Sequence, residues 1–216
     1  DINDPLNPEI VGGYADDSYT HDAQIVNYQG PDPEFRGREI LFGSNSDGGE
    51  NNQIVIIDVT NKSNPIKISS TNYLVSGYTH QGILSKDHKY FFLGDELDEL
   101  LYGSPTLTRI FDLSELSNPK IHHTYFAGVN AIDHNGYVKG SKFYLASYTS
   151  GLRVIDILNI KQIAVVSSMA AWRGMPMSAA YSSSKAAIRT AIESFEIDYS
   201  DTGVRFRIFY PGFVKT

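Results

Sequence analysis

A repeated turn sequence is the feature that most limits how this chain can fold. An Asp is followed six and seven positions later by Asn-Pro in three copies, which begin at Asp1, Asp58 and Asp112. The spacing between successive copies is therefore nearly constant. Apolar runs rich in β-branched and aromatic residues precede the second and third copies, at 53–57 and 108–111. The pattern predicts a strand ending at Asp, a turn in which Asp and Asn cap backbone N–H groups, and a strand starting at Pro.

A histidine keeps register with this turn. His21, His80 and His134 follow the Asp of their own copies at nearly the same distance along the chain. After each histidine come an apolar stretch, a polar turn and a further predicted strand. Four short strands per unit of about 45–55 residues are typical of β-propeller blades. We therefore expect residues 1–160 to be an all-β segment of about two and a half blades, where closed propellers have roughly 4–8.

The strands of this part carry a family resemblance. Ile56-Ile57-Asp58 and Val154-Ile155-Asp156, together with the downstream Asn-Pro turn, resemble the LVIVD-repeat propellers of the choice-of-anchor B group. The resemblance covers about residues 1–160. It implies a bacterial secreted or cell-surface protein that binds an unknown protein or small-molecule ligand, and the repeat itself implies no enzymatic activity.

The repeated histidines permit two interpretations. They could line a central channel and hold a metal ion through their imidazoles. Alternatively, each starts an inner strand and hydrogen-bonds to the neighbouring blade, since His at equivalent positions follows from repetition alone. We assign no metal site from the sequence and keep His21, His80 and His134 as the candidates.

Two oxygen-rich segments, 46–52 and 95–99, have side chains that could hold Ca²⁺. Neither has the spacing of an EF-hand loop. We therefore predict that both are solvated acidic loops.

The sequence changes character shortly after a fourth copy of the repeat begins at Asp156. Positions 162 and 163, where Asn-Pro is due, are Gln and Ile. Residues 1–160 carry a net charge of −10, and residues 161–216 carry +3. Nucleic acid requires a basic surface, so the acidic first part and the small, scattered charge of the second argue against it. No apolar run approaches the roughly 18 residues that a membrane span needs.

The second part predicts one βαβ unit. Residues 162–167 read as a buried strand of the parallel kind, 178–200 as a helix and 204–210 as a second strand. One face of the helix is apolar, at Ile188, Ala191, Ile192, Phe195 and Tyr199. The predicted fold class is therefore mixed: incomplete all-β propeller blades followed by a βαβ fragment of a Rossmann-type α/β fold.

Residues 161–216 contain three short motifs. Tyr181 and Lys185 form a Tyr-x-x-x-Lys pair, and Ser168 lies 13 residues before the Tyr. The stretch 211–216 reads Pro-Gly-x-Val-x-Thr and follows the next predicted strand. Together and in this order, the three motifs resemble the catalytic half of short-chain dehydrogenases/reductases, and because all three are present the resemblance is specific.

The spacing suits acid–base chemistry. Tyr181 and Lys185 lie one helical turn apart, and a neighbouring ammonium favours the phenolate form that a general base needs. The resemblance implies that Ser168 hydrogen-bonds the substrate carbonyl or hydroxyl, and that NAD or NADP is the cofactor. The implied cofactor-binding residues are Tyr181, Lys185, which holds the nicotinamide ribose, and Pro211, Gly212, Val214 and Thr216, in the stretch that faces the carboxamide.

The cofactor-binding half of that family is missing. No Gly-x-x-x-Gly-x-Gly turn, which would place a pyrophosphate at a helix N-terminus, occurs in the 216 residues. We predict two incomplete domains, 1–160 and 161–216, in an apparent chimera with few contacts between its parts. The predicted function is a binding or scaffold segment joined to an oxidoreductase fragment that is inactive alone.

The alternative function is a short-chain dehydrogenase/reductase, completed by another chain, that transfers hydride between NAD(P) and a carbonyl or alcohol. The two parts also predict different compartments, because the propeller resemblance implies secretion or the cell surface and the reductase resemblance implies the cytoplasm. Open strand edges in both parts predict oligomers.

Overall fold

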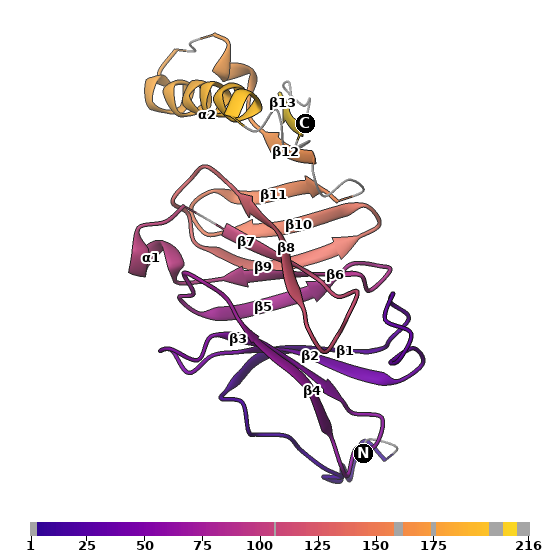
Figure 1. Cartoon of the computed structure of the whole chain (residues 1–216). Coiled ribbons are helices and arrows are strands. Elements are labelled where there is room, and N and C mark those ends of the chain that lie inside the picture. The colour runs from indigo at the N-terminus through magenta and orange to yellow at the C-terminus, as the bar shows by residue number, and fades with distance from the viewer. Residues whose placement is uncertain (1–3, 106, 158–161, 174–175, 199–204, 211–216) are drawn as a thin grey trace.

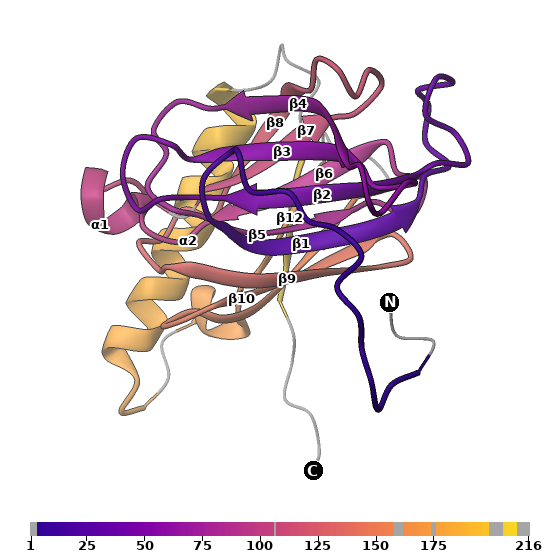
Figure 2. The ribbon, with the colours of Figure 1, turned by 90° about the horizontal axis from the view of Figure 1, so that it is seen from below.

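The sheets of the molecule follow one another in chain order along its length (Figure 1). The computed structural model describes residues 4–105, 107–157, 162–173, 176–198 and 205–210. The first sheet pairs β1 (Thr20–Asn27), β2 (Glu39–Asn45), β3 (Gln53–Asp58) and β4 (Ile66–Asn72) in that order (Figure 2). The second pairs β5 (Thr79–Leu84), β6 (Tyr90–Asp95), β7 (Leu107–Asp112) and β8 (Lys120–Phe126). The third pairs β9 (Asp133–Lys139), β10 (Lys142–Ser147) and β11 (Gly151–Asp156).

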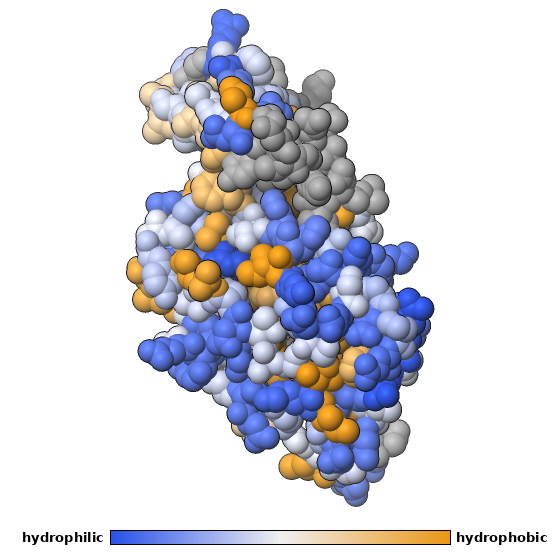
Figure 3. Space-filling view, viewed as in Figure 1, coloured by the Kyte–Doolittle hydropathy of each residue, from blue (hydrophilic) through white to orange (hydrophobic). Residues whose placement is uncertain are grey.

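These three sheets are antiparallel meanders, which confirms the mostly β character of the first part. Among the described residues, no strand of the third sheet pairs with the first, so the stack does not close into a ring. Figure 3 shows a largely hydrophilic face on which apolar residues form separate patches. No helix in the described ranges is both long and apolar enough to cross a membrane.

The Asp-to-Asn-Pro turn forms as the sequence predicts. β3 ends at Asp58 and β7 at Asp112, and the next strand begins directly after the Pro of each copy. The Asp58 carboxylate accepts a hydrogen bond from the backbone N–H of Thr60 at 2.9 Å, and that of Asp112 from Ser114 at 2.8 Å. Burial favours the neutral form of both carboxylates, but the hydrogen bonds outweigh it and hold each pKa below its usual value.

We call the first strand of each of the three sheets (β1, β5 and β9) its inner strand. The three inner strands share an irregularity beside their histidine. In each, the pairing with the next strand shifts register within the first residues of the strand, where the histidine is the second residue. Such bulges turn side chains away from the regular alternation of a strand. The repeat therefore places three histidines in the same local geometry.

Two glycines in the inner strands make room for aromatic rings. A Cβ at Gly82 would overlap the ring of Phe91, and one at Gly136 would overlap the ring of Phe143. In the second and third sheets, an aromatic ring of the second strand thus packs directly over the glycine of the first strand.

Glutamine side chains join the inner strands of successive sheets. Oε1 of Gln24 in β1 accepts a hydrogen bond from the backbone N–H of Leu84 in β5 at 2.8 Å. Gln81 in β5 accepts from the backbone N–H of Gly136 in β9 at 2.8 Å and donates to its carbonyl at 3.2 Å. The amides therefore bridge strands that belong to different sheets.

The C-terminal elements form the predicted βαβ unit. Strand β12 (Gln162–Val166) pairs in parallel with β13 (Arg205–Phe209), and between them lie the short 3₁₀ turn η1 (Met169–Ala171) and helix α2 (Ala179–Asp198). Ile188, Ile192 and Phe195 of the predicted apolar face pack into a hydrophobic cluster. Tyr199, predicted on the same face, lies outside the described residues.

The two parts share this cluster, so the prediction that they make few contacts is wrong. Ile192 of α2, Val165 of β12 and Phe206 of β13 are buried together with Phe143 and Ile155 of the third sheet. β12 also lies beside β11 (Figure 1). Hydrophobic burial has no directional requirement, so the apolar stripe of the helix and the apolar residues of the sheets pack together whatever their origin.

Asp95, Asp98 and Glu99 of the segment 95–99 are buried, so the prediction of a solvated loop is wrong there. Asp95 is fully buried, and its carboxylate accepts hydrogen bonds from the backbone N–H groups of Gly77 at 2.9 Å and Tyr78 at 2.6 Å. These bonds fix the loop that leads into β5. Of the other oxygen-rich segment, 46–52, residues 47–51 are exposed as predicted, whereas Ser46 and Asn52 at its ends are buried and hydrogen-bonded to each other.

Two buried carboxyl groups beside this segment favour their neutral form. Burial, reinforced by the carboxylates of Asp95 and Glu99, raises the pKa of Asp98 to about 8. Asp98 lies at the start of the short helix α1 (Asp98–Tyr102). Burial, reinforced by Glu99 and Asp98, raises the pKa of Asp133 well above its ordinary value of 3.8. Nη2 of Arg109 lies 3.4 Å from Oδ2 of Asp98, and its positive charge opposes part of the rise in the pKa of Asp98.

We expect Asp98→Asn to flatten the pH dependence of stability between about pH 4 and about pH 8. The native state keeps a proton on Asp98 that the unfolded chain releases above the ordinary pKa of 3.8, so wild-type stability falls as pH rises through this range toward about 8. The variant has no such proton to release. Urea denaturation at about pH 5 and about pH 8 measures the difference.

Asp47→Asn is the matched control. Hydrogen bonds from Asn51 and Gly49 lower the pKa of the exposed Asp47, so its small contribution is present at neutral pH and lost only in acid. A loss of stability between the two pH values that is as steep in Asp98→Asn as in the wild type would contradict the assignment.

We expect Ile192→Ala to lower the stability of the whole chain by about 2–4 kcal/mol, because it leaves a cavity in the shared cluster. Ile197→Ala, at an exposed position of the same helix, should change stability by less than about 0.5 kcal/mol. Fluorescence of Trp172, the only Trp, reports on the C-terminal part, and circular dichroism reports mainly on the sheets. Separate unfolding transitions for the two probes would show that the parts do not share a core.

Candidate functional site

The residues that resemble a catalytic set lie at two places on the βαβ unit. Tyr181 and Lys185 occupy the first half of α2, and Ser168 follows β12. The first turn of the helix is closed by a hydrogen bond from the backbone N–H of Ser182 to the carbonyl of Ser178 at 2.8 Å. The Tyr and Lys are therefore set by helical geometry, whereas the Ser depends on the path of the chain between strand and helix.

Lys185 lies beside the ring of Tyr181. Its Nζ is 5.5 Å from the ring centroid, within the range of a cation–π contact. The Tyr side chain is 50% exposed, and the Lys is partly buried. The pair thus has the side-by-side arrangement that the sequence predicts.

Both residues line a cavity of about 460 Å³. Its other lining residues include Leu152 and Arg153 of β11 and Tyr125 of β8, so the third sheet and its neighbour contribute to the wall. Tyr181 and Lys185 therefore line a space formed jointly by the two parts of the chain.

Ser168 is not among the described residues that line this cavity. Its Oγ accepts a hydrogen bond from the backbone N–H of Ala170 at 3.2 Å, within the turn of η1. Trp172 holds this turn beside α2, because the guanidinium carbon of Arg189 lies 4.4 Å from the centroid of its ring. The structure thus brings together Tyr181 and Lys185, while Ser168 caps its own turn.

The described residues do not fit the phosphate part of NAD or NADP. A Rossmann-type fold binds the pyrophosphate at a helix N-terminus after a Gly-rich turn. The first turn of α1 carries Glu99, whose carboxylate repels an anion, and α2 follows Met177 and Ser178 rather than a Gly-rich turn. The other predicted cofactor contacts, Pro211, Gly212, Val214 and Thr216, lie outside the described residues.

The repeated histidines form a row across the three inner strands. The ring centroids of His21 and His80 are 4.3 Å apart, and those of His80 and His134 are 4.5 Å apart. Nδ1 of His21 lies 2.9 Å from the carbonyl oxygen of His80, which confirms the predicted link between neighbouring units at that position. All three line a cavity of about 550 Å³. Burial lowers the pKa of His80, although the nearby Glu96 opposes this.

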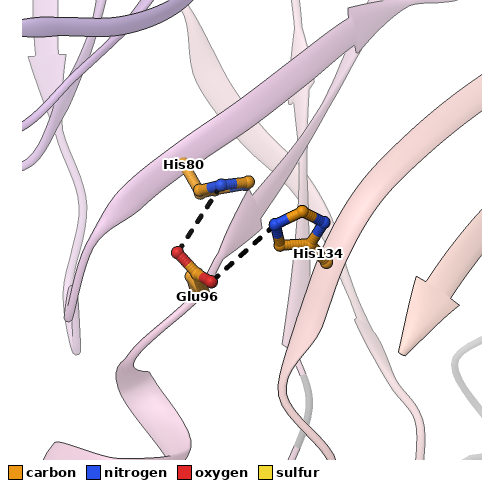
Figure 4. Close-up of side chains that lie close together, drawn as sticks. All are labelled: His80, Glu96 and His134. Atoms are coloured by element: carbon orange, nitrogen blue, oxygen red, sulfur yellow. Dashed lines mark ion pairs between the residues drawn. The ribbon is translucent and has the colours of Figure 1, made fainter. Parts of the chain in front are cut away.

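Two residues beside this row, Glu96 and Tyr148, were not linked to the histidines from the sequence, and Glu96 was considered only as part of the oxygen-rich segment 95–99. Nε2 of His80 lies 3.5 Å from Oε2 of Glu96, and Nε2 of His134 lies 3.9 Å from Oε1 (Figure 4). The hydroxyl of Tyr148 donates a hydrogen bond to Oε1 of Glu96 at 2.8 Å. Glu96 directly follows β6, which pairs with the strand that carries His80. Its place at the end of the strand after His80 was the sequence signal that could have put it beside the histidine.

Comparison with known proteins concerns the last quarter of the chain. A family model for short chain dehydrogenase matches residues 160–216. A protein of Myxococcus xanthus (strain DK1622), named "Uncharacterized oxidoreductase", is 53% identical to this chain over 51 residues. The match covers 24% of this chain and 20% of that relative, so the chain spans about a fifth of the relative's length. Residues 160–216 are therefore a segment of short-chain dehydrogenase type.

Proposed function

We propose that residues 1–160 act as a propeller-type binding or scaffold segment and that residues 161–216 supply the proton-transfer part of an oxidoreductase site that does not work in this chain alone. The observation that carries the proposal is the Tyr181–Lys185 pair, which lies beside one cavity in a segment matched to short chain dehydrogenases. The family as a whole uses NAD or NADP.

The repeated architecture of the first part supports its role as a binding segment. Two four-stranded meanders and a three-stranded one follow in chain order, with the same Asp turn after β3 and β7. Their inner strands line one cavity. Propeller blades present their inner strands to a central channel, which is where we place the ligand of this segment.

The chemistry of the second part is acid–base. Tyr181 moves a proton at its hydroxyl, and the ammonium of Lys185 stabilises the negative charge left on the oxygen. A bound NAD or NADP would exchange the hydride. Because Ser168 is engaged in its own turn and the described helix ends offer no pyrophosphate site, we infer that the chain alone does not complete the reaction.

A second candidate function is hydride transfer between NAD(P) and a carbonyl or alcohol, with the missing half supplied by another chain. The identity of 53% to an oxidoreductase over 51 residues favours it, because that relative is about five times longer than the matched stretch. This proposal requires a partner that places a dinucleotide in the cavity beside Tyr181.

We expect calorimetry of the whole chain to detect no binding of NAD or NADP at micromolar concentrations. The physical reason is the lack of a Gly-rich turn, which normally supplies the pyrophosphate contacts. Titration of ATP serves as a control for non-specific phosphate binding.

Lys185→Ala tests whether any binding uses the site beside Tyr181. If the wild type binds either dinucleotide with micromolar affinity and the variant does not, the active-oxidoreductase function replaces the scaffold function. If neither protein binds, the chain alone has no dinucleotide site, and the second candidate function then depends on its partner.

We also propose that the chain self-associates through open strand edges, as its unclosed stack of sheets suggests. Size-exclusion chromatography with light scattering should then give a mass above the 24.0 kDa of one chain. Ile66→Lys, at an exposed position of the edge strand β4, should reduce association. A monodisperse species with the mass of a single chain would contradict this proposal.

A further inference from the structure

A carboxylate and two imidazoles converge where the second and third sheets meet. His80 begins β5, His134 begins β9, and Glu96 follows β6. The ligand-type atoms of all three side chains lie within 4.8 Å of one another. His80 is buried, and the other two are partly exposed (Figure 4).

The spacing is too long for hydrogen bonds. The distances from Glu96 to His80 and His134 are 3.5 and 3.9 Å, whereas hydrogen bonds of this type are about 2.7–3.2 Å. Ligand atoms on a tetrahedral Zn²⁺, each about 2.1 Å from the metal, lie about 3.4 Å apart. Small rotations of the side chains therefore suffice to form such a site.

We propose that His80, Glu96 and His134 bind a divalent transition metal ion, with Zn²⁺ as the best match to two imidazoles and one carboxylate. Three protein ligands leave a coordination position for water or a small ligand. His80 and His134 also line the cavity of about 550 Å³, which offers space beside them. The proposal is independent of the oxidoreductase segment.

Groups around the three ligands hold Glu96 in place. The hydroxyl of Tyr148 donates to Oε1 at 2.8 Å, and the backbone N–H of Glu96 donates to the carbonyl of Tyr78 at 3.0 Å. Hydrogen bonds of this kind orient metal-ligating carboxylates. His21 is not one of the three proposed ligands, because its Nδ1 is hydrogen-bonded to the backbone carbonyl of His80.

The test is titration of the whole metal-free chain with Zn²⁺ by calorimetry, and with Co²⁺ by visible absorption. We expect one equivalent of Zn²⁺ and the intense absorption of four-coordinate Co²⁺. Glu96→Gln and His134→Ala should each weaken binding at least tenfold, and Tyr148→Phe should weaken it about 10- to 100-fold. Circular dichroism checks that each variant is folded.

His122→Ala is the matched control, because His122 is an exposed histidine of β8 outside the cluster. It should bind Zn²⁺ as the wild type does, and His21→Ala should retain one equivalent. The proposal fails if Glu96→Gln binds with unchanged affinity, if the control loses the site, or if wild-type Co²⁺ gives only the weak spectrum of the hydrated ion.

Discussion

The amide side chains of Gln24 and Gln81 link successive sheets at their inner strands. Apolar packing holds the sheets together, but dispersion and hydrophobic burial are not directional. The bonds from Gln24 to Leu84 and from Gln81 to Gly136 are directional, and they set the register between inner strands. The row of histidines and the convergence on Glu96 both depend on this register.

The features that sequence reasoning predicted correctly are local ones. The turn at Asp58 needs only the residues of the turn itself, and Tyr181 and Lys185 meet because four residues make one helical turn. The strand–helix–strand order of the second part was also correct, since apolar periodicity follows from each element alone. The position of Ser168 is not local, and Ser168 is not among the described residues that line the cavity.

The failures concern contacts between elements distant in sequence. The acidic side chains of the segment 95–99 suggested that it is exposed to solvent. Hydrogen bonds from the backbone N–H groups of Gly77 and Tyr78 instead offset the cost of burying the Asp95 carboxylate. The repeat could not predict that Glu96 lies beside His80 and His134. Among the described residues, the first and third sheets contribute no equivalent carboxylate to this cluster. The shared core around Ile192 escaped prediction for the same reason: composition shows where the sequence changes character, not which surfaces then meet.

The contact between β11 and β12 limits how the third sheet can be extended by a fourth strand. In the first two sheets a fourth strand, β4 or β8, hydrogen-bonds to the third. In the third sheet β12 lies beside that third strand instead, with the apolar face of α2 buried behind it. A fourth strand would have to displace the βαβ unit. The unit therefore occupies the edge at which the third sheet would take a fourth strand, so such a strand and the cavity around Tyr181 exclude each other.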